Sequence, residues 1–264
     1  MPLLALKLVL TPLLIGGASL AARRWGPAVG GLIVALPLTS GPVAFFLALD
    51  YGAAFAAEAV VGSLGGLVAI VAFSLAYAAA GSRFGAGAGL VAAALAYVVT
   101  GLLVRPFVDA SIWLLLALVV SSVTLALRLL PRGGKRTAAP RHPRWDLPAR
   151  MAIATGLVVG LTAIAPRLGP QTSGLVATFP VYVAVMAAFT QRHQGAPAAI
   201  DVLRGLLAGL FGTAAFYVVV HLAIVPMGIA AAFLLATSIT LGIHAIALRR
   251  VRAMSPGPIE PEPA

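Results

Sequence analysis

Long apolar stretches fill most of the chain, and short groups of glycine, proline and charged residues separate them. A helix that spans a bilayer needs about 20 mostly apolar residues, and nine stretches approach that length. Lipid cannot hydrogen-bond to an open backbone, so each stretch is predicted to be a helix. The predicted spans are 3–22, 29–49, 54–79, 86–104, 110–130, 149–166, 172–190, 198–221 and 226–248.

Basic residues are concentrated in alternate loops between these spans. The loop from Arg128 to Arg150 holds seven of them, and loops rich in Lys and Arg face the cytoplasm. With this loop inside, 15 of the 18 basic residues fall on the cytoplasmic side, and only Lys7, Arg105 and Arg167 fall outside. We therefore expect a multi-pass protein of the bacterial cytoplasmic (inner) membrane, with its N-terminus outside and its C-terminus in the cytoplasm.

The chain also matches itself when it is shifted by 143 residues without a gap. Between residues 16 and 73 this match has 19 identities in 58 positions, and it pairs Pro37 with Pro180 and Glu58 with Asp201. Spans 1–4 therefore recur as spans 6–9, and the fifth span joins the two copies. Because four spans plus one linker span reverse the direction of the chain, the second copy is inverted relative to the first.

The predicted fold is thus an all-α polytopic membrane protein of about nine transmembrane helices, arranged as a 4+1+4 inverted-topology repeat. Its expected parts are repeat 1 at 1–106, a linker helix at 107–131, a basic cytoplasmic loop at 132–148, repeat 2 at 149–250 and a disordered cytoplasmic tail at 251–264.

The second and seventh spans are predicted to be broken helices. Each has a proline near its middle, Pro37 or Pro180, and a proline inside a helix removes a hydrogen bond and clashes with the preceding turn. Unwound backbone at membrane depth is tolerated where it faces protein or a wet cavity, and paired breaks of this kind point to a substrate site. The predicted substrate-binding residues are Pro37, Thr39, Ser40, Gly41, Pro42, Thr178, Pro180 and Tyr182. The alternative is that these prolines and hydroxyls only shape and join helices.

Glu58 and Asp201 are the acidic pair that the repeat relates, and each is predicted about one turn inside its span. Acidic groups in spans are costly, so we expect them to bind a coupling ion or to close a gate, together with Arg204 at i+3 from Asp201. The alternative is that they cap the starts of helices, where a negative charge complements the helix dipole.

Composition narrows the function classes. The chain is 61% hydrophobic and 9% charged, against roughly half and a quarter in soluble domains, which excludes a soluble enzyme and a disordered chain. It contains no cysteine, so it has no disulfide or thiolate site. No ATP-binding loop, nucleophile–base set or metal-ligand spacing is present, so we expect no catalytic residue, metal, cofactor or nucleic-acid partner. The net charge of +11 is then mainly an orientation signal.

Two glycine pairs are related by the repeat: Gly62-x3-Gly66 and Gly205-x3-Gly209. They should allow close helix packing, with a homodimer face as the alternative.

The stretch Leu-Pro-x-Thr-Ser-Gly at 36–41 resembles the LP-x-SS-TG stretch of bacterial undecaprenyl pyrophosphate phosphatases, which are also small inverted-repeat membrane proteins. The chain lacks that family's flanking acidic residues, its histidine and its arginine motif, so no function is inferred from the resemblance.

The sequence therefore favours a secondary transporter of a small polar or anionic solute, working by alternating access around the broken second and seventh spans. Coupling to H+ or Na+ would use Glu58 or Asp201. The alternatives are a membrane-embedded lipid-phosphate enzyme or lipid carrier, and a structural or accessory membrane subunit.

Overall fold

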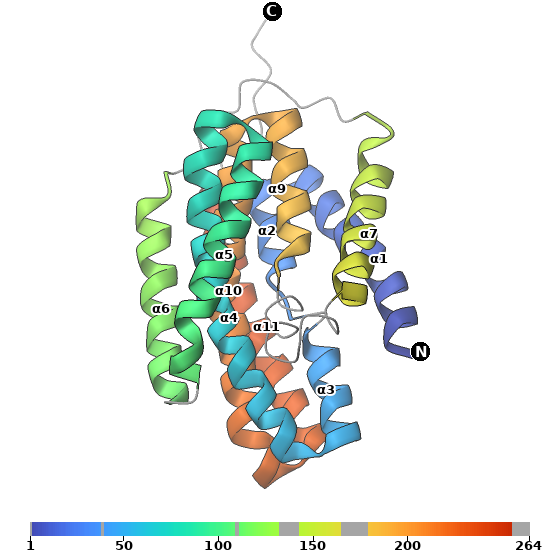
Figure 1. Cartoon of the computed structure of the whole chain (residues 1–264), viewed down its shortest axis with the longest axis vertical. Helices are drawn as coiled ribbons and strands as arrows, with labels where there is room; N and C mark the ends of the chain where they lie inside the picture. Colours follow the sequence, from blue (N-terminus) through green and yellow to red (C-terminus); the bar gives the residue numbers. More distant parts are fainter. Residues whose placement is uncertain (1, 38–39, 109–110, 132–142, 165–178, 255–264) are drawn as a thin grey trace, which may run out of the picture.

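The computed structural model describes residues 2–37, 40–108, 111–131, 143–164 and 179–254, and this part of the chain is helical, without strands (Figure 1). The helices are α1 (Pro2–Trp25), α2 (Pro27–Val34), α3 (Ser40–Tyr51), α4 (Ala53–Phe84), α5 (Ala86–Val108), α6 (Ile112–Leu129), α7 (Asp146–Ile164), α9 (Val181–Gln194), α10 (Ala196–Met227) and α11 (Ile229–Met254).

Five of these helices are long and apolar enough to cross a membrane: α4, α5, α6, α10 and α11. Their outer faces carry large exposed apolar side chains, such as Leu95 on α5 and Leu234 on α11. A soluble protein rarely exposes so much contiguous apolar surface, whereas a bilayer covers it. The chain is therefore an all-α, multi-pass membrane protein.

Several predicted spans have different boundaries in the structure. The span predicted at 29–49 is two short helices, α2 with 8 residues and α3 with 12, because the chain is not helical around Pro37. The spans predicted at 54–79 and 198–221 lie inside the helices α4 and α10, each of 32 residues. These two helices continue beyond the predicted ends of the spans until a glycine stops them.

Glycines with positive φ set the ends of α4 and α10. Gly52 (φ 91°) and Gly85 (φ 88°) flank α4, and Gly195 (φ 86°) and Gly228 (φ 81°) flank α10. Only glycine adopts this backbone conformation without a steric penalty, so each glycine ends one helix and lets the next begin within a residue.

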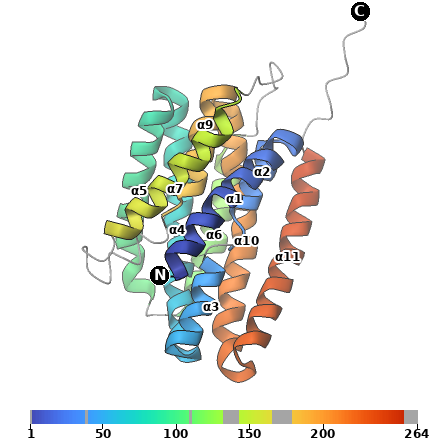
Figure 2. The ribbon, with the colours of Figure 1, turned by 90° about the vertical axis from the view of Figure 1, so that its right-hand side faces the viewer.

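Helix α10 lies at the centre of the bundle. It packs against α2, α4, α6, α9 and α11, and its side chains Leu203, Leu207 and Ile224 are fully buried. Helix α6 packs against both α4 and α10, while α1 and α7 lie side by side along one flank (Figures 1 and 2).

The backbones of α2 and α10 approach each other closely where the two helices cross. A Cβ atom on Gly31 would overlap the carbonyl oxygen of Val202, and one on Gly205 would overlap that of Ala28. The two backbones therefore touch, which only glycine permits. The Gly205-x3-Gly209 motif packs within the fold, as expected, whereas the Cβ position of Gly62 meets open space.

This crossing gives the first prediction. Gly31→Ala should lower the midpoint of thermal unfolding in detergent, because the added methyl group forces the backbones apart and overpacking of this kind costs about 1–3 kcal/mol. Gly242→Ala on α11, where a Cβ would meet no atom within 4 Å, should leave the midpoint unchanged or raise it. Equal midpoints for the two variants would contradict the contact.

Candidate functional site

The break between α2 and α3 is the central feature of the candidate site. Helix α2 ends at Val34 with Ala35 as its C-cap, and α3 begins at Ser40. Pro37 lies between them and has no N–H with which to continue the helix. The predicted break is therefore present in this span, although Thr39 lies outside the described residues.

Two hydroxyl groups of α10 bridge the break. Thr213 Oγ1 donates a hydrogen bond to the carbonyl oxygen of Ala35, the C-cap of α2. One turn further along α10, the Tyr217 hydroxyl donates to Ser40 Oγ over 2.8 Å. Thr213 and Tyr217 were not predicted, and the available signal was a pair of hydroxyl side chains at i and i+4 within the apolar stretch 205–220 of this helix.

Helix α9 carries the described part of the predicted seventh span. Pro180 is the N-cap of α9, and the Tyr182 hydroxyl is hydrogen-bonded to Thr11 of α1 at 3.1 Å. Thr178 lies outside the described residues, so the break predicted in this span is not tested. Tyr182 joins α9 to α1 in the described structure.

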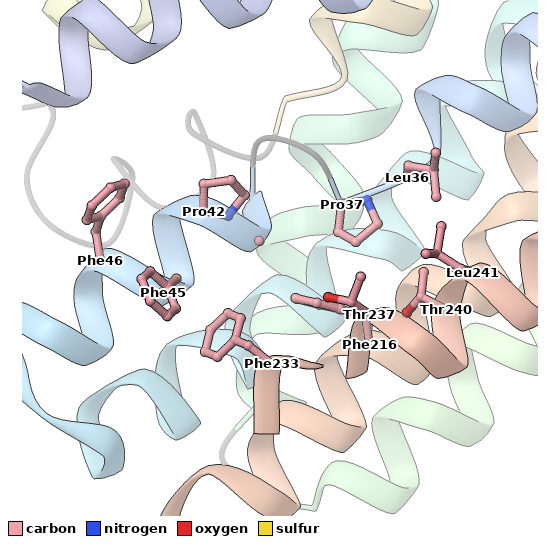
Figure 3. A pocket seen from close by; sticks show the side chains of 11 residues that line it. Leu36, Pro37, Pro42, Phe45, Phe46, Phe216, Phe233, Thr237, Thr240 and Leu241 are labelled. Atoms are coloured by element: carbon pink, nitrogen blue, oxygen red, sulfur yellow. The ribbon is translucent and has the colours of Figure 1, made fainter. Parts of the chain in front are cut away.

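A cavity of about 510 Å³ lies beside the break (Figure 3). It brings together Pro37, Gly41 and Pro42 of the predicted site, whereas Ser40, Pro180 and Tyr182 are not among the residues that line it. The walls come from the α2–α3 break, α3, α10 and α11. The lining residues are Leu36, Pro37, Gly41, Pro42, Phe45, Phe46, Phe216, Phe233, Thr237, Thr240 and Leu241.

His244 lies buried one turn beyond the cavity on α11. Its Nδ1 is 3.0 Å from the carbonyl oxygen of Thr240, and its Nε2 has no hydrogen-bond partner among the described residues. The ring occupies the space that a Cβ at Gly212 would need, so this glycine makes room for it.

The residues predicted for coupling or gating lie away from this cavity. Glu58 is exposed on α4, and Asp201 is half-buried on α10. Arg204 Nη1 donates to the carbonyl oxygens of Leu127 and Leu130, at 2.9 and 2.6 Å, and so pairs the last carbonyls of α6. A cation at a helix C-terminus also complements the helix dipole. Arg204 therefore fastens α6 to α10.

A buried carboxylate that the sequence analysis missed lies where α1, α7 and α9 meet. Asp146 is the first residue of α7 and is 0% exposed. Arg23 of α1 donates to its Oδ2 over 2.7 Å, and Arg150 Nε donates to both of its oxygens over 3.1 Å. His193 Nε2 of α9 lies 3.1 Å from its Oδ1, close enough for an ion pair when the ring is protonated.

Further contacts hold the arginine in place. Arg150 Nη1 donates to Thr190 over 3.5 Å, and its guanidinium lies 5.2 Å from the centre of the Phe189 ring. We call Arg23, Asp146, Arg150 and His193 the Asp146 network. It ties the end of α1 to the start of α7 and the end of α9.

The cations around Asp146 decide its charge. Burial opposes ionisation of the carboxyl group, but hydrogen bonds from Arg23 and Arg150 and the charges of Arg150 and His193 outweigh it, so the pKa of Asp146 lies below its ordinary value. One signal was available in the sequence, because Asp146 is the single acidic residue in the basic stretch 128–150.

No protein-family model, curated protein or solved structure matches the chain. Its function is therefore argued from its own residues.

The Asp146 network gives the second prediction. Asp146→Asn leaves two arginines without their buried anion, and breaking a buried ion pair costs about 3–5 kcal/mol. The midpoint of thermal unfolding should fall sharply, whereas Asp50→Asn at an exposed position should change stability by no more than about 0.5 kcal/mol.

The carboxyl group of Asp146 also predicts that the stability of the fold depends on pH. A carboxyl group whose folded-state pKa is depressed contributes stability above its unfolded pKa, and this contribution is lost as the pH falls through the lower folded-state value. The native chain should therefore lose stability below about pH 4 more steeply than Asp146→Asn. Parallel acid-unfolding curves would show that Asp146 is not paired in solution.

Proposed function

We propose that the protein is a secondary transporter of a small solute, and that it works by alternating access around the break between α2 and α3. The observation that carries this proposal is the cavity of about 510 Å³ beside a broken helix in a bundle of membrane helices. Interrupted helices at membrane depth are the usual location of transporter substrate sites. A purely structural subunit needs no such cavity.

An inverted repeat is part of the proposal, and the helix boundaries support it. Ala53 and Ala196, which begin α4 and α10, are 143 positions apart, and so are Phe84 and Met227, which end them. The flanking glycines have the same spacing and closely similar φ values, 91° and 86° at the starts and 88° and 81° at the ends. The helix ends and the flanking glycines therefore recur 143 positions later, which is the same shift that aligns the sequence with itself.

Nine spans follow from the same offset. In this proposal α1, the pair α2 and α3, α4 and α5 form the first half, α6 is the linker, and α7, the span 172–190, α10 and α11 form the second half. The contacts of α6 with both α4 and α10 suit a linker between related halves. The second break at Pro180 then lies opposite the first.

The repeat and the proposed orientation predict the sides on which two loops lie. Phe84 and Met227 are equivalent, exposed residues, at 76% and 53%, and the chain contains no native cysteine. In right-side-out vesicles, Phe84→Cys should resist a membrane-impermeant maleimide and Met227→Cys should react with it, while inside-out vesicles should reverse the pattern. Reaction of both cysteines from one side would exclude the inverted topology.

The Asp146 network is proposed as the cytoplasmic gate. It links α1 of the first half to α7 and α9 of the second, because Arg23, Arg150 and His193 all approach the buried carboxylate of Asp146. Glu58 and Asp201 remain the proposed sites for H+ or Na+, since the repeat relates them. Opening the gate would separate the halves on the side where the basic loops lie.

The lipid-phosphate enzyme receives less support. Such an enzyme needs a shared cationic cavity at one leaflet, but Arg24 and Arg192 are exposed and Arg204 is bound to the carbonyls of α6. None of the three lines the described cavity.

Accessibility of the break tests the transporter. In alternating access the break faces each side in turn, so Ser40→Cys should react with an impermeant maleimide in right-side-out and in inside-out vesicles. Leu95→Cys on the lipid-facing side of α5 should react in neither. A Ser40→Cys protein that reacts from a single side, or not at all, would rule out alternating access around this break.

A further inference from the structure

The described residues that line the cavity offer little to a polar solute. None of its eleven residues is charged, and only Thr237 and Thr240 have polar side chains. Thr240 Oγ1 already donates towards the carbonyl oxygens of Ala236 and Gly212, at 2.7 and 3.2 Å. A polar group that loses water without gaining a partner pays a penalty of roughly 1–3 kcal/mol.

Three of the described polar groups at the break are also engaged by the protein. The carbonyl oxygen of Ala35 accepts from Thr213, and Ser40 accepts from Tyr217. The amide N–H of Gly41 donates to the carbonyl oxygen of Pro37 over 2.8 Å. Of the hydroxyl groups that the sequence offered as ligands for a polar solute, Ser40 therefore stabilises the break itself.

Aromatic rings form a continuous wall instead. Phe45 of α3 and Phe233 of α11 meet edge to face at 5.2 Å, and Phe233 meets Phe216 of α10 at 5.9 Å. Phe46 extends the row beyond Phe45, at 6.1 Å. Such a surface binds apolar groups through the area that it removes from water.

The mouth of the cavity faces the outside of the bundle. The lining residues Leu241 and Phe46 are 53% and 38% exposed, and Thr237 is exposed as well. They lie on α11 and α3, and α11 is one of the five apolar helices of membrane length. The mouth therefore lies beside a helix that is long and apolar enough to be surrounded by lipid.

We propose that the cavity binds the hydrocarbon chain of an amphipathic lipid substrate, which enters sideways between α3 and α11. The inference rests on the proposed function in treating this cavity as the substrate site, and it replaces the polar or anionic solute that the sequence favoured. The volume of about 510 Å³ is within the usual range of ligand sites, roughly 300–1,000 Å³.

Photolabelling in proteoliposomes tests this assignment. The full chain is reconstituted in phosphatidylcholine that contains a small share of phosphatidylcholine with a diazirine in mid-acyl chain, and the labelled residues are mapped by mass spectrometry after illumination. Phe45 and Phe233 should be labelled more strongly than Leu95, which is 62% exposed on α5.

Neighbouring residues on α11 supply matched variants. Thr237→Trp fills the mouth and should lower labelling of Phe45 and Phe233 several-fold, whereas Ser238→Trp changes an adjacent exposed position outside the cavity and should not. Leu241→Trp, one turn further along α11, is a second filling variant. Labelling of Phe45 and Phe233 that is no stronger than that of Leu95, or that Thr237→Trp and Leu241→Trp leave unchanged, would overturn the proposal.

The photolabelling experiment and the Ser40→Cys accessibility experiment can fail independently of each other. Labelled Phe45 and Phe233 in a protein whose Ser40→Cys is unreactive would keep the lipid site and remove transport. An unlabelled cavity in a protein whose Ser40→Cys reacts from both sides would keep transport and remove the lipid substrate.

Discussion

The crossing of α2 and α10 is the contact on which the rest of the described structure depends. Gly31 and Gly205 let the two backbones touch, so α2 is held along the central helix of the bundle. Only at that short distance can the Thr213 hydroxyl reach the carbonyl that ends α2. The break, its bridging hydrogen bonds and the cavity beside it all follow from this approach.

A broken helix in a membrane leaves backbone groups that lipid cannot satisfy. The chain resolves this problem with its own hydroxyls, because Thr213 and Tyr217 hold the two ends of the break. The described groups that are paired in this way have little capacity left for a polar ligand. The apolar wall is therefore the more informative guide to what the cavity binds.

Much of this architecture could be predicted from the sequence, because membrane helices are marked by long apolar runs and their ends by glycine. The break at Pro37 was predictable, since proline cannot continue a helix. The uses of Ser40 and Tyr182 were not, because their partners Tyr217 and Thr11 lie more than 170 positions away. Asp146 was missed for the same reason, since its importance depends on cations from α1 and α9 that only the fold brings together.

The length of α4 and α10 has a consequence for the surrounding bilayer. Each has 32 residues, which at 1.5 Å per residue is about 48 Å, whereas the hydrocarbon core is about 30 Å thick. Both helices must therefore lie at a slant or protrude into the headgroups. Because glycines fix their ends, these two helices cannot shorten, and a thinner or thicker membrane should instead change the angle at which they stand.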